Sequence, residues 1–488
     1  MTITRPRHPV RSGRRSLAAG AGLSAAAMLL AAVPSLPARA APFVGTVGTS
    51  PAASGIDLEQ RVDNPFAGSV GYVDPEWSAL AAEYPRGESI ARTPTAIWLD
   101  DVDSIAGPID GPGTDGTAEP LTYRIMSLRQ HLDRALVQQK EAGGVPLTVQ
   151  VVLHDLPGRD CWRSDQHGEM AQDRIDRYRS LYIDRIWRIL AVPAFRSLRI
   201  AVVVEPMALP SLVAGTGSGH LSDACRRMLE NGNYVEGIQY ALDVLGQYSN
   251  VYLYLDLAHH GFIGWQDTLE PTLDLVAKTV RETKRGPAGV TGFTVNVANY
   301  GATVEPFYTV DNTVAGTSVR ASRWVDWNWE VDEQPFALGA RARLITHGFP
   351  PTIGMVIDTS RNGWGGADRP TGPSASQDVN TFVDGSRTDR RHSATYGWCN
   401  QEKAGLGARP TASPVPGIDA YAWIKPPGES DGSYPSNHAA GLLGTMCDPD
   451  PASSRSPVRS GAMPEAPRYG EWFGAHFVRL LENAYPRL

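Results

Sequence analysis

Seven short apolar runs recur along the chain, each rich in Val, Ile, Leu or Tyr. Apolar and polar residues do not alternate cleanly within them, which is typical of strands that are buried on both faces. The sequence therefore predicts seven buried strands, at residues 95–100, 147–155, 199–207, 251–259, 292–300, 352–359 and 419–425.

Helical periodicity separates most of these runs. The first helix is predicted to end at Gly143-Gly144, and it is marked by leucines and an isoleucine spaced three and four residues apart: Leu121, Ile125, Leu128, Leu132 and Leu136. Similar patterns predict helices at residues 170–190, 234–248, 267–284, 333–348 and 467–485. Strands that alternate with helices pair in parallel, so the pattern favours a parallel (β/α) barrel of about seven strands over an open α/β sheet.

Polar or aromatic residues close nearly every predicted strand. In an α/β barrel the active site is built from the C-terminal strand ends and the loops that follow them. A single polar end would merely satisfy loop backbone groups, but six or seven on one rim favour a polar pocket. These residues are Trp98, Asp100, His154, Asp155, Asp256, His259, Asn296, Asn299, Asp358 and Lys425. Two long loops, at residues 360–400 and 426–450, are predicted to cover that pocket.

The first 40 residues have the composition of an export signal. They hold six arginines and no acidic residue, and an apolar run leads to the small-x-small sequence Ala38-Arg39-Ala40. A membrane anchor is the weaker alternative, and both the general and the twin-arginine export routes remain open. We expect a signal peptide at 1–40 with cleavage near Ala40, a flexible leader at 41–60, and one catalytic domain at 61–488.

Removal of residues 1–40 lowers Lys+Arg from 45 to 39 and leaves Asp+Glu at 52, so the net charge becomes about −13. This charge argues against nucleic acid or an anionic membrane as a partner.

The four cysteines, in an exported chain, predict two disulfides. Pairing in sequence order is one of three connectivities, and the absence of a Cys-x-x-Cys pair argues against a zinc or redox site.

Twelve tryptophans are present, several of them at strand ends or in the cover loops. A flat indole stacks on the apolar face of a sugar ring, although each tryptophan alone could equally belong to the core. Hydrolysis of a glycosidic bond requires a general acid and, for inversion, a base that activates water. Candidate carboxylates in rim loops are Asp160, Asp165, Asp256 and Asp431, and composition does not choose among them.

Seven segments, in order, resemble the motifs of glycoside hydrolase family 6, and the pattern is most similar to bacterial cellobiohydrolases. The first two are the segment from His154 to Cys161 and the segment from Val204 to Pro210. The others are residues 254–265, 296–300, 358–366, 398–400 and 425–432, and the likeness runs from about Asn64 to the C-terminus.

The resemblance implies a distorted parallel (β/α) barrel that hydrolyses β-1,4-glucan with inversion. Together with the export signal, it leads us to expect a secreted monomer that needs no cofactor and no metal. By position, Asp160 is the carboxylate that assists the acid, and Asp431 is the proposed base. The residues implied to bind glucan are Trp98, Asp100, His259, Trp265, Asn299, Trp398, Lys425 and Glu429. The family's disulfides match Cys161–Cys225 and Cys399–Cys447.

The chain departs from the family at the catalytic centre. Met207 occupies the position of the proton-donating Asp, and a thioether has no proton to transfer. His154 replaces a Tyr, Gln166 replaces the serine that positions water, and Phe262 replaces a stacking Trp. Glu205 lies two residues before Met207 on the same strand face, roughly 6–7 Å deeper in the barrel. At that depth we do not expect its carboxyl to reach a glycosidic oxygen.

Two hypotheses follow from these departures. The first is a cellobiohydrolase-type hydrolase with weakened or rerouted acid catalysis, in which Asp160 or Asp165 is a substitute acid. The second is a non-catalytic protein that binds β-glucan.

Overall fold

The computed structural model describes residues 61–106, 126–163, 168–214, 221–433, 444–450 and 459–488. The expected signal peptide and leader lie outside these residues. Every described residue belongs to one compact unit, Pro42–Leu488. Among the described residues, no helix is long and apolar enough to cross a membrane.

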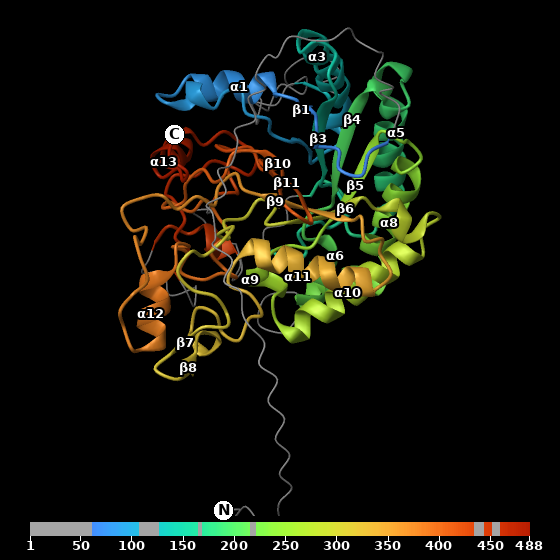
Figure 1. Cartoon of the computed structure of the whole chain (residues 1–488). Helices are drawn as coiled ribbons and strands as arrows, with labels where there is room; N and C mark the ends of the chain where they lie inside the picture. The colour runs from blue at the N-terminus through green and yellow to red at the C-terminus, as the bar shows by residue number, and fades with distance from the viewer. Residues whose placement is uncertain (1–60, 107–125, 164–167, 215–220, 434–443, 451–458) are drawn as a thin grey trace, which may run out of the picture. The chain divides into compact units, whose positions relative to one another are not determined.

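A curled sheet forms the centre of this unit (Figure 1). Its strand order is β1-β3-β4-β5-β6-β9-β11-β10, and β2 also pairs with β3. All neighbours are parallel except β10 and β11. The bounds are β1 Val70–Gly71, β2 Ile97–Leu99, β3 Leu147–Leu153, β4 Leu198–Val204, β5 Val251–Asp256, β6 Gly292–Val295, β9 Gly354–Asp358, β10 Thr411–Val415 and β11 Ile418–Ala422.

The two ends of the sheet meet at one point. Thr95, just before β2, forms an isolated parallel bridge with Trp423, just after β11. The Ala96 N–H donates to the Trp423 carbonyl at 3.2 Å. The bounds of the strands confirm the seven predicted ones as β2, β3, β4, β5, β6, β9 and β11. The predicted distorted barrel is confirmed as a curled sheet that this bridge closes.

Apolar residues on both faces of the strands explain why the sequence shows no alternation. On β3, Val149 and Val151 face the main core between the sheet and its helices, whereas Val152 faces the barrel interior. On β5, Leu253 belongs to the outer core and Tyr252 to the inner one. Burial on both faces fixes the register of each strand, so the strand ends are held in place.

Helices cover the outside of the sheet, with α5 and α8 to its right and α10 and α11 below it in Figure 1. The bounds are α1 Pro75–Ala82, α2 Asp103–Ala106, α3 Leu128–Glu141, α4 Ile175–Arg177, α5 Asp184–Leu190, α6 Ala208–Ala214, α7 Asp223–Asn231, α8 Asn233–Leu245, α9 His260–Ile263, α10 Gln266–Arg281, α11 Glu333–Thr346, α12 Val379–Ser386 and α13 Gly474–Glu482. A small hairpin, β7 Thr313–Val314 with β8 Thr317–Ser318, lies in the loop after β6. A second core joins α1 to α13 through Trp77, Phe477 and Leu480.

Three helix predictions need correction at their boundaries. Helix α3 begins at Leu128, where Ser127 forms a capping box with Gln130, and Leu121 and Ile125 lie outside the described residues. The helix predicted at 170–190 contains a π-helical stretch, Tyr178–Ile183, between α4 and α5. The helix predicted at 467–485 begins only at Gly474, because the backbone before it pairs with the loop at residues 428–430.

Candidate active site

A pocket opens at the C-terminal ends of the parallel strands. Its walls come from Trp98 on β2, from the residues that follow β3 to β6, and from the loops after β9 and β11. This is the arrangement that the polar strand ends predicted. It is lined by Trp98, His154, Asp160, Trp162, Arg163, Pro206, Met207, His259, Phe262, Val297, Ala298, Asn299, Thr395, Trp398, Asp431 and Tyr469.

Six of the ten predicted site residues line this pocket: Asp160, Asp431, Trp98, His259, Asn299 and Trp398. The other four do not, and their contact with glucan stays a prediction. Lys425 and Glu429 form a buried ion pair at 2.8 Å, with side chains 1% and 0% exposed. The Trp265 indole donates to the Asp326 carbonyl at 2.7 Å, and the Asp100 carbonyl accepts from Arg159.

Asp431 is held as a carboxylate. The Arg361 guanidinium donates to both of its oxygens, at 2.8 and 2.9 Å, and the Tyr300 hydroxyl donates at 2.6 Å. Burial alone would raise the pKa of Asp431, but Arg361 and Lys425 hold it below its ordinary value. An ionised, oriented carboxylate beside a pocket is the group that a general base requires.

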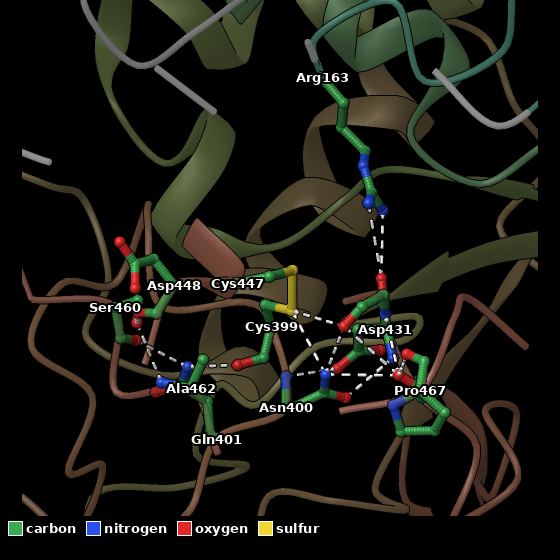
Figure 2. The surroundings of a disulfide bond; sticks show 12 residues. Arg163, Cys399, Asn400, Gln401, Asp431, Cys447, Asp448, Ser460, Ala462 and Pro467 are labelled. Atoms are coloured by element: carbon green, nitrogen blue, oxygen red, sulfur yellow. Dashed lines mark hydrogen bonds between the residues drawn. A yellow bond between two sulfur atoms is a disulfide. The ribbon is translucent and has the colours of Figure 1, made fainter. Parts of the chain in front are cut away.

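The disulfide between Cys399 and Cys447 lies beside Asp431 (Figure 2). Asn400, next to Cys399, donates its N–H to Asp431 Oδ2 and accepts from the Asp431 N–H with its side chain, both at 2.8 Å. The disulfide therefore fixes the segment that positions this carboxylate. Both expected bridges are confirmed, with S–S distances of 2.05 Å for Cys161–Cys225 and 2.10 Å for Cys399–Cys447.

Asp160 and His154 form a second polar pair in the pocket. His154 Nε2 lies 3.5 Å from Asp160 Oδ1, and His154 Nδ1 lies 3.3 Å from the Tyr469 hydroxyl. Burial would raise the pKa of Asp160, but His154, Arg163 and Arg159 together lower it below the ordinary value. Asp160 is therefore ionised at neutral pH and holds no proton for a leaving group, which argues against it as a substitute acid.

Met207 sits on a strained turn directly after β4. Glu205 and Met207 have φ angles of 48° and 65°, in the left-handed region that non-glycine residues avoid. The Met207 N–H donates to Asp256 Oδ2 at 2.9 Å, which holds this turn in place. Such strain concentrates at functional sites. The chain thus keeps a costly backbone conformation that directs residue 207 to the pocket, although the side chain there has no proton to give.

Two other carboxyls near Met207, those of Asp256 and Glu205, have partners of their own and do not line the pocket. Burial raises the pKa of Asp256 to about 7, but it accepts the Met207 and Ala258 N–H groups and the Thr294 hydroxyl, and it does not line the pocket. Glu205 is 2% exposed and accepts the Tyr178 hydroxyl at 2.8 Å. Asp165 and Gln166 lie outside the described residues.

Some of the polar strand ends serve the backbone rather than the pocket. Asp358 accepts N–H groups from Ala298, Ser360, Ile424 and Lys425. The side chain of Asn296 donates to the Asp358 carbonyl at 2.8 Å and accepts the Gly301 N–H. Asp358 and Asn296 therefore hold the turns that carry the pocket-lining groups. Some polar residues at the strand ends are structural, and others face the pocket.

Within the described part of the chain, three buried nitrogens in the pocket walls have no hydrogen-bond partner: His259 Nδ1, Trp162 Nε1 and Trp398 Nε1. Burial, with Arg391 and His260, lowers the pKa of His259 well below its ordinary value, so its ring is neutral. Buried polar atoms are normally satisfied, and unsatisfied ones in a pocket mark places where a ligand can bond.

Sequence reasoning assigned no role to several residues that build the site. Tyr300 and Arg361 lie within matched motifs, but the motifs alone did not show that both hold Asp431. Arg391 donates to Asn299 Oδ1 at 2.8 Å and binds Asp389, and Tyr469 contacts His154. Tyr469 carried no signal, because its segment had a helical pattern.

Among the described residues, one group could hold a metal ion away from the pocket. Ligand atoms of Asp74, Glu76 and His131 lie within 4.8 Å of one another. Asp74 caps α1, Glu76 accepts the Met126 N–H, and His131 pairs with the Tyr72 hydroxyl at 3.0 Å. The polar atoms thus already have structural partners.

The profile described as "Glycosyl hydrolases family 6" matches residues 75–484. The chain belongs to glycoside hydrolase family 6. It is 40% identical over 463 residues to a protein named Exoglucanase A from Cellulomonas fimi, an alignment that covers 90% of this chain and 50% of that one. This chain therefore spans about half the length of that relative.

Solved structures of the family have the same fold. The catalytic domain of Cellulomonas fimi Cel6B is 39% identical, with a TM-score of 0.78, and the match covers 88% of this chain and 96% of that one. Cellobiohydrolase II from Humicola insolens, in complex with glucose and cellotetraose, is 25% identical with a TM-score of 0.64, over 87% of this chain and 100% of that one.

Proposed function

We propose that the protein is an exported β-1,4-glucan hydrolase of the cellobiohydrolase type that works by inversion with impaired acid catalysis. The observation that carries this proposal is the setting of Asp431, an ionised carboxylate that Arg361 and Tyr300 orient at the wall of an aromatic pocket. The family membership and the relatives named as exoglucanase and cellobiohydrolase support it.

In this mechanism Asp431 removes a proton from the water that attacks the anomeric carbon, directly or through a chain of waters. The Asp160 carboxylate, ionised and close to Met207 in the pocket lining, stabilises the positive charge that develops on the sugar ring. Trp98 and Trp398 hold sugar rings by stacking, while His259 and Asn299 bond hydroxyl groups. No cofactor or metal is assigned a role.

The impaired acid catalysis in this proposal follows from Met207, whose side chain has no proton to donate. Without a general acid the leaving sugar departs as an alkoxide, and the lost assistance typically costs 10²–10⁴-fold in rate, to order of magnitude. Because Asp431, Asp160 and the aromatic walls remain, we expect slow residual hydrolysis.

A second candidate is a glucan-binding protein without activity, which Met207 also favours. Turnover of amorphous cellulose, measured beside a binding isotherm for cello-oligosaccharides, separates the two. Slow turnover with binding supports the hydrolase, binding without any turnover supports the second candidate, and the absence of both defeats them together.

We also propose that residues 1–40 are a signal peptide cleaved near Ala40, that 41–60 form a leader, and that 61–488 act as a monomeric catalytic domain. The mass and N-terminal sequence of the exported protein test the cleavage site, and sedimentation tests the monomer. An intact N-terminus on the exported protein would contradict this assignment.

A further inference from the structure

Trp327 is the most exposed large apolar side chain in the described part of the chain, at 59% of its surface. The other eleven tryptophans are buried or partly buried. Single exposed apolar residues are common and need no function. Trp327 differs because the surrounding backbone is strained and tightly held, and because its sequence neighbours Asp326 and Asn328 contact the segment that follows the pocket-lining His259.

The strain lies in two consecutive residues. Asp326 and Trp327 have φ angles of 47° and 64°, and the left-handed region is unfavourable for a bulky side chain such as Trp. The Trp327 N–H donates to the Arg320 carbonyl at 2.7 Å, and Arg320 Nη2 donates back to the Trp327 carbonyl at 2.8 Å. Arg320 also bonds the Asn328 carbonyl at 3.0 Å and stacks on Trp329. The loop therefore presents its indole from a rigid base.

The same loop contacts residues that neighbour the pocket-lining His259 and Phe262 in sequence. The Trp265 indole donates to the Asp326 carbonyl at 2.7 Å, and the Asn328 side chain donates to the His260 carbonyl at 2.8 Å. A Cβ on Gly264 would lie 2.2 Å from Asn328 Oδ1, so the loop and the end of α9 are in close contact. An aromatic series thus leads outward from Phe262 in the pocket, through the partly exposed Trp265, to the loop of Trp327.

We infer that Trp327 is a stacking platform for a sugar ring of a β-glucan chain that extends beyond the pocket. This inference rests on the proposed function. A rigid, flat indole suits the apolar face of a pyranose and loses little conformational entropy on binding. A protein partner would need a wider apolar surface. The other exposed residues between 321 and 330 are Ala321, Arg323 and Asp326, which provide one methyl group and two charges.

The test compares Trp327→Ala with the unmodified protein by calorimetric titration with cellotriose and cellohexaose and by adsorption to amorphous cellulose. Stacking energies predict roughly two- to tenfold weaker binding of cellohexaose and cellulose, with cellotriose unchanged, because a short ligand fills the pocket without reaching the loop. Trp327→Tyr keeps an aromatic face and should bind within about twofold of the unmodified protein. Leu229→Ala, at a side chain that is 44% exposed on α7, is the matched surface control and should change nothing.

Equal affinity of Trp327→Ala and the unmodified protein for the long ligands would overturn the inference and leave the proposed function intact. Equal losses for short and long ligands, with a lowered melting temperature, would assign Trp327 a structural role and also overturn it. If the unmodified protein binds none of these glucans, the proposed function fails first and the inference with it.

Discussion

Met207→Asp is expected to restore acid catalysis, because the site still holds the turn that presents this residue. Asp is several-fold enriched among residues with positive φ, so the φ of 65° at position 207 suits it better than Met. The new carboxyl would lie in a partly buried position close to the ionised Asp160. Burial and a neighbouring negative charge both raise the pKa of a carboxyl, which is the shift that a general acid needs.

The expected gain in kcat/KM on cellohexaose is about 10²–10⁴-fold, the usual contribution of a general acid. The assay compares cellohexaose with β-cellobiosyl fluoride, whose fluoride leaving group depends much less on protonation. The gain on the fluoride should stay within about threefold, well under the range for acid assistance. Met207→Asn is the matched control, since its side chain has nearly the same shape and no acidic proton.

Two results would contradict a restored proton donor at position 207. An equal gain on both substrates would mean that the substitution improves binding or folding rather than proton donation. No gain on cellohexaose, in a protein with an unchanged melting temperature, would mean that His154 or Phe262 has altered the site beyond repair by one residue.

Three further changes test other parts of the site. Asp431→Asn should lower turnover of the fluoride at least 10²-fold, because Arg361 would then hold a neutral amide that cannot take a proton; unchanged turnover would exclude Asp431 as the base. Replacement of Cys399 and Cys447 by Ser should lower the free energy of unfolding in urea by about 2–5 kcal/mol, and an unchanged midpoint would show that the bridge does not stabilise the fold. Burial raises the pKa of Asp419 from 3.8, the value expected in the unfolded chain, to about 7. The contribution of the neutral carboxyl to stability is therefore complete below pH 3.8 and is lost as the pH rises towards 7. Melting temperatures between pH 4 and pH 8 should therefore fall less steeply in Asp419→Asn, and parallel curves would contradict this shift.

The strands were predictable because both of their faces are apolar, and the polar residues at their ends located the pocket. The environment of Asp431 could not be predicted in this way, because its partners Tyr300 and Arg361 lie 131 and 70 residues away in sequence. Periodicity describes neighbours along one element, and it contains no information about loops that meet across a barrel.

The helix boundaries illustrate the same limit. Residues 467–473 have a helical pattern, but their backbone pairs with the loop that carries Asp431. Tertiary hydrogen bonds here outweigh local propensity, as they commonly do. The pairing of the cysteines could likewise be narrowed only by resemblance to a family, because four cysteines allow three connectivities.

The proposed function requires that the chain retains the base and the glucan-binding pocket of its family and lacks the general acid. The most direct test measures kcat/KM of the unmodified protein on cellohexaose and on β-cellobiosyl fluoride, beside a family member that has Asp at the position of Met207. We expect turnover of the fluoride within about tenfold of that enzyme and turnover of cellohexaose at least 10²-fold lower. Comparable turnover of cellohexaose by the two proteins would contradict it and would require another proton donor in the pocket, with His154 the first residue to replace.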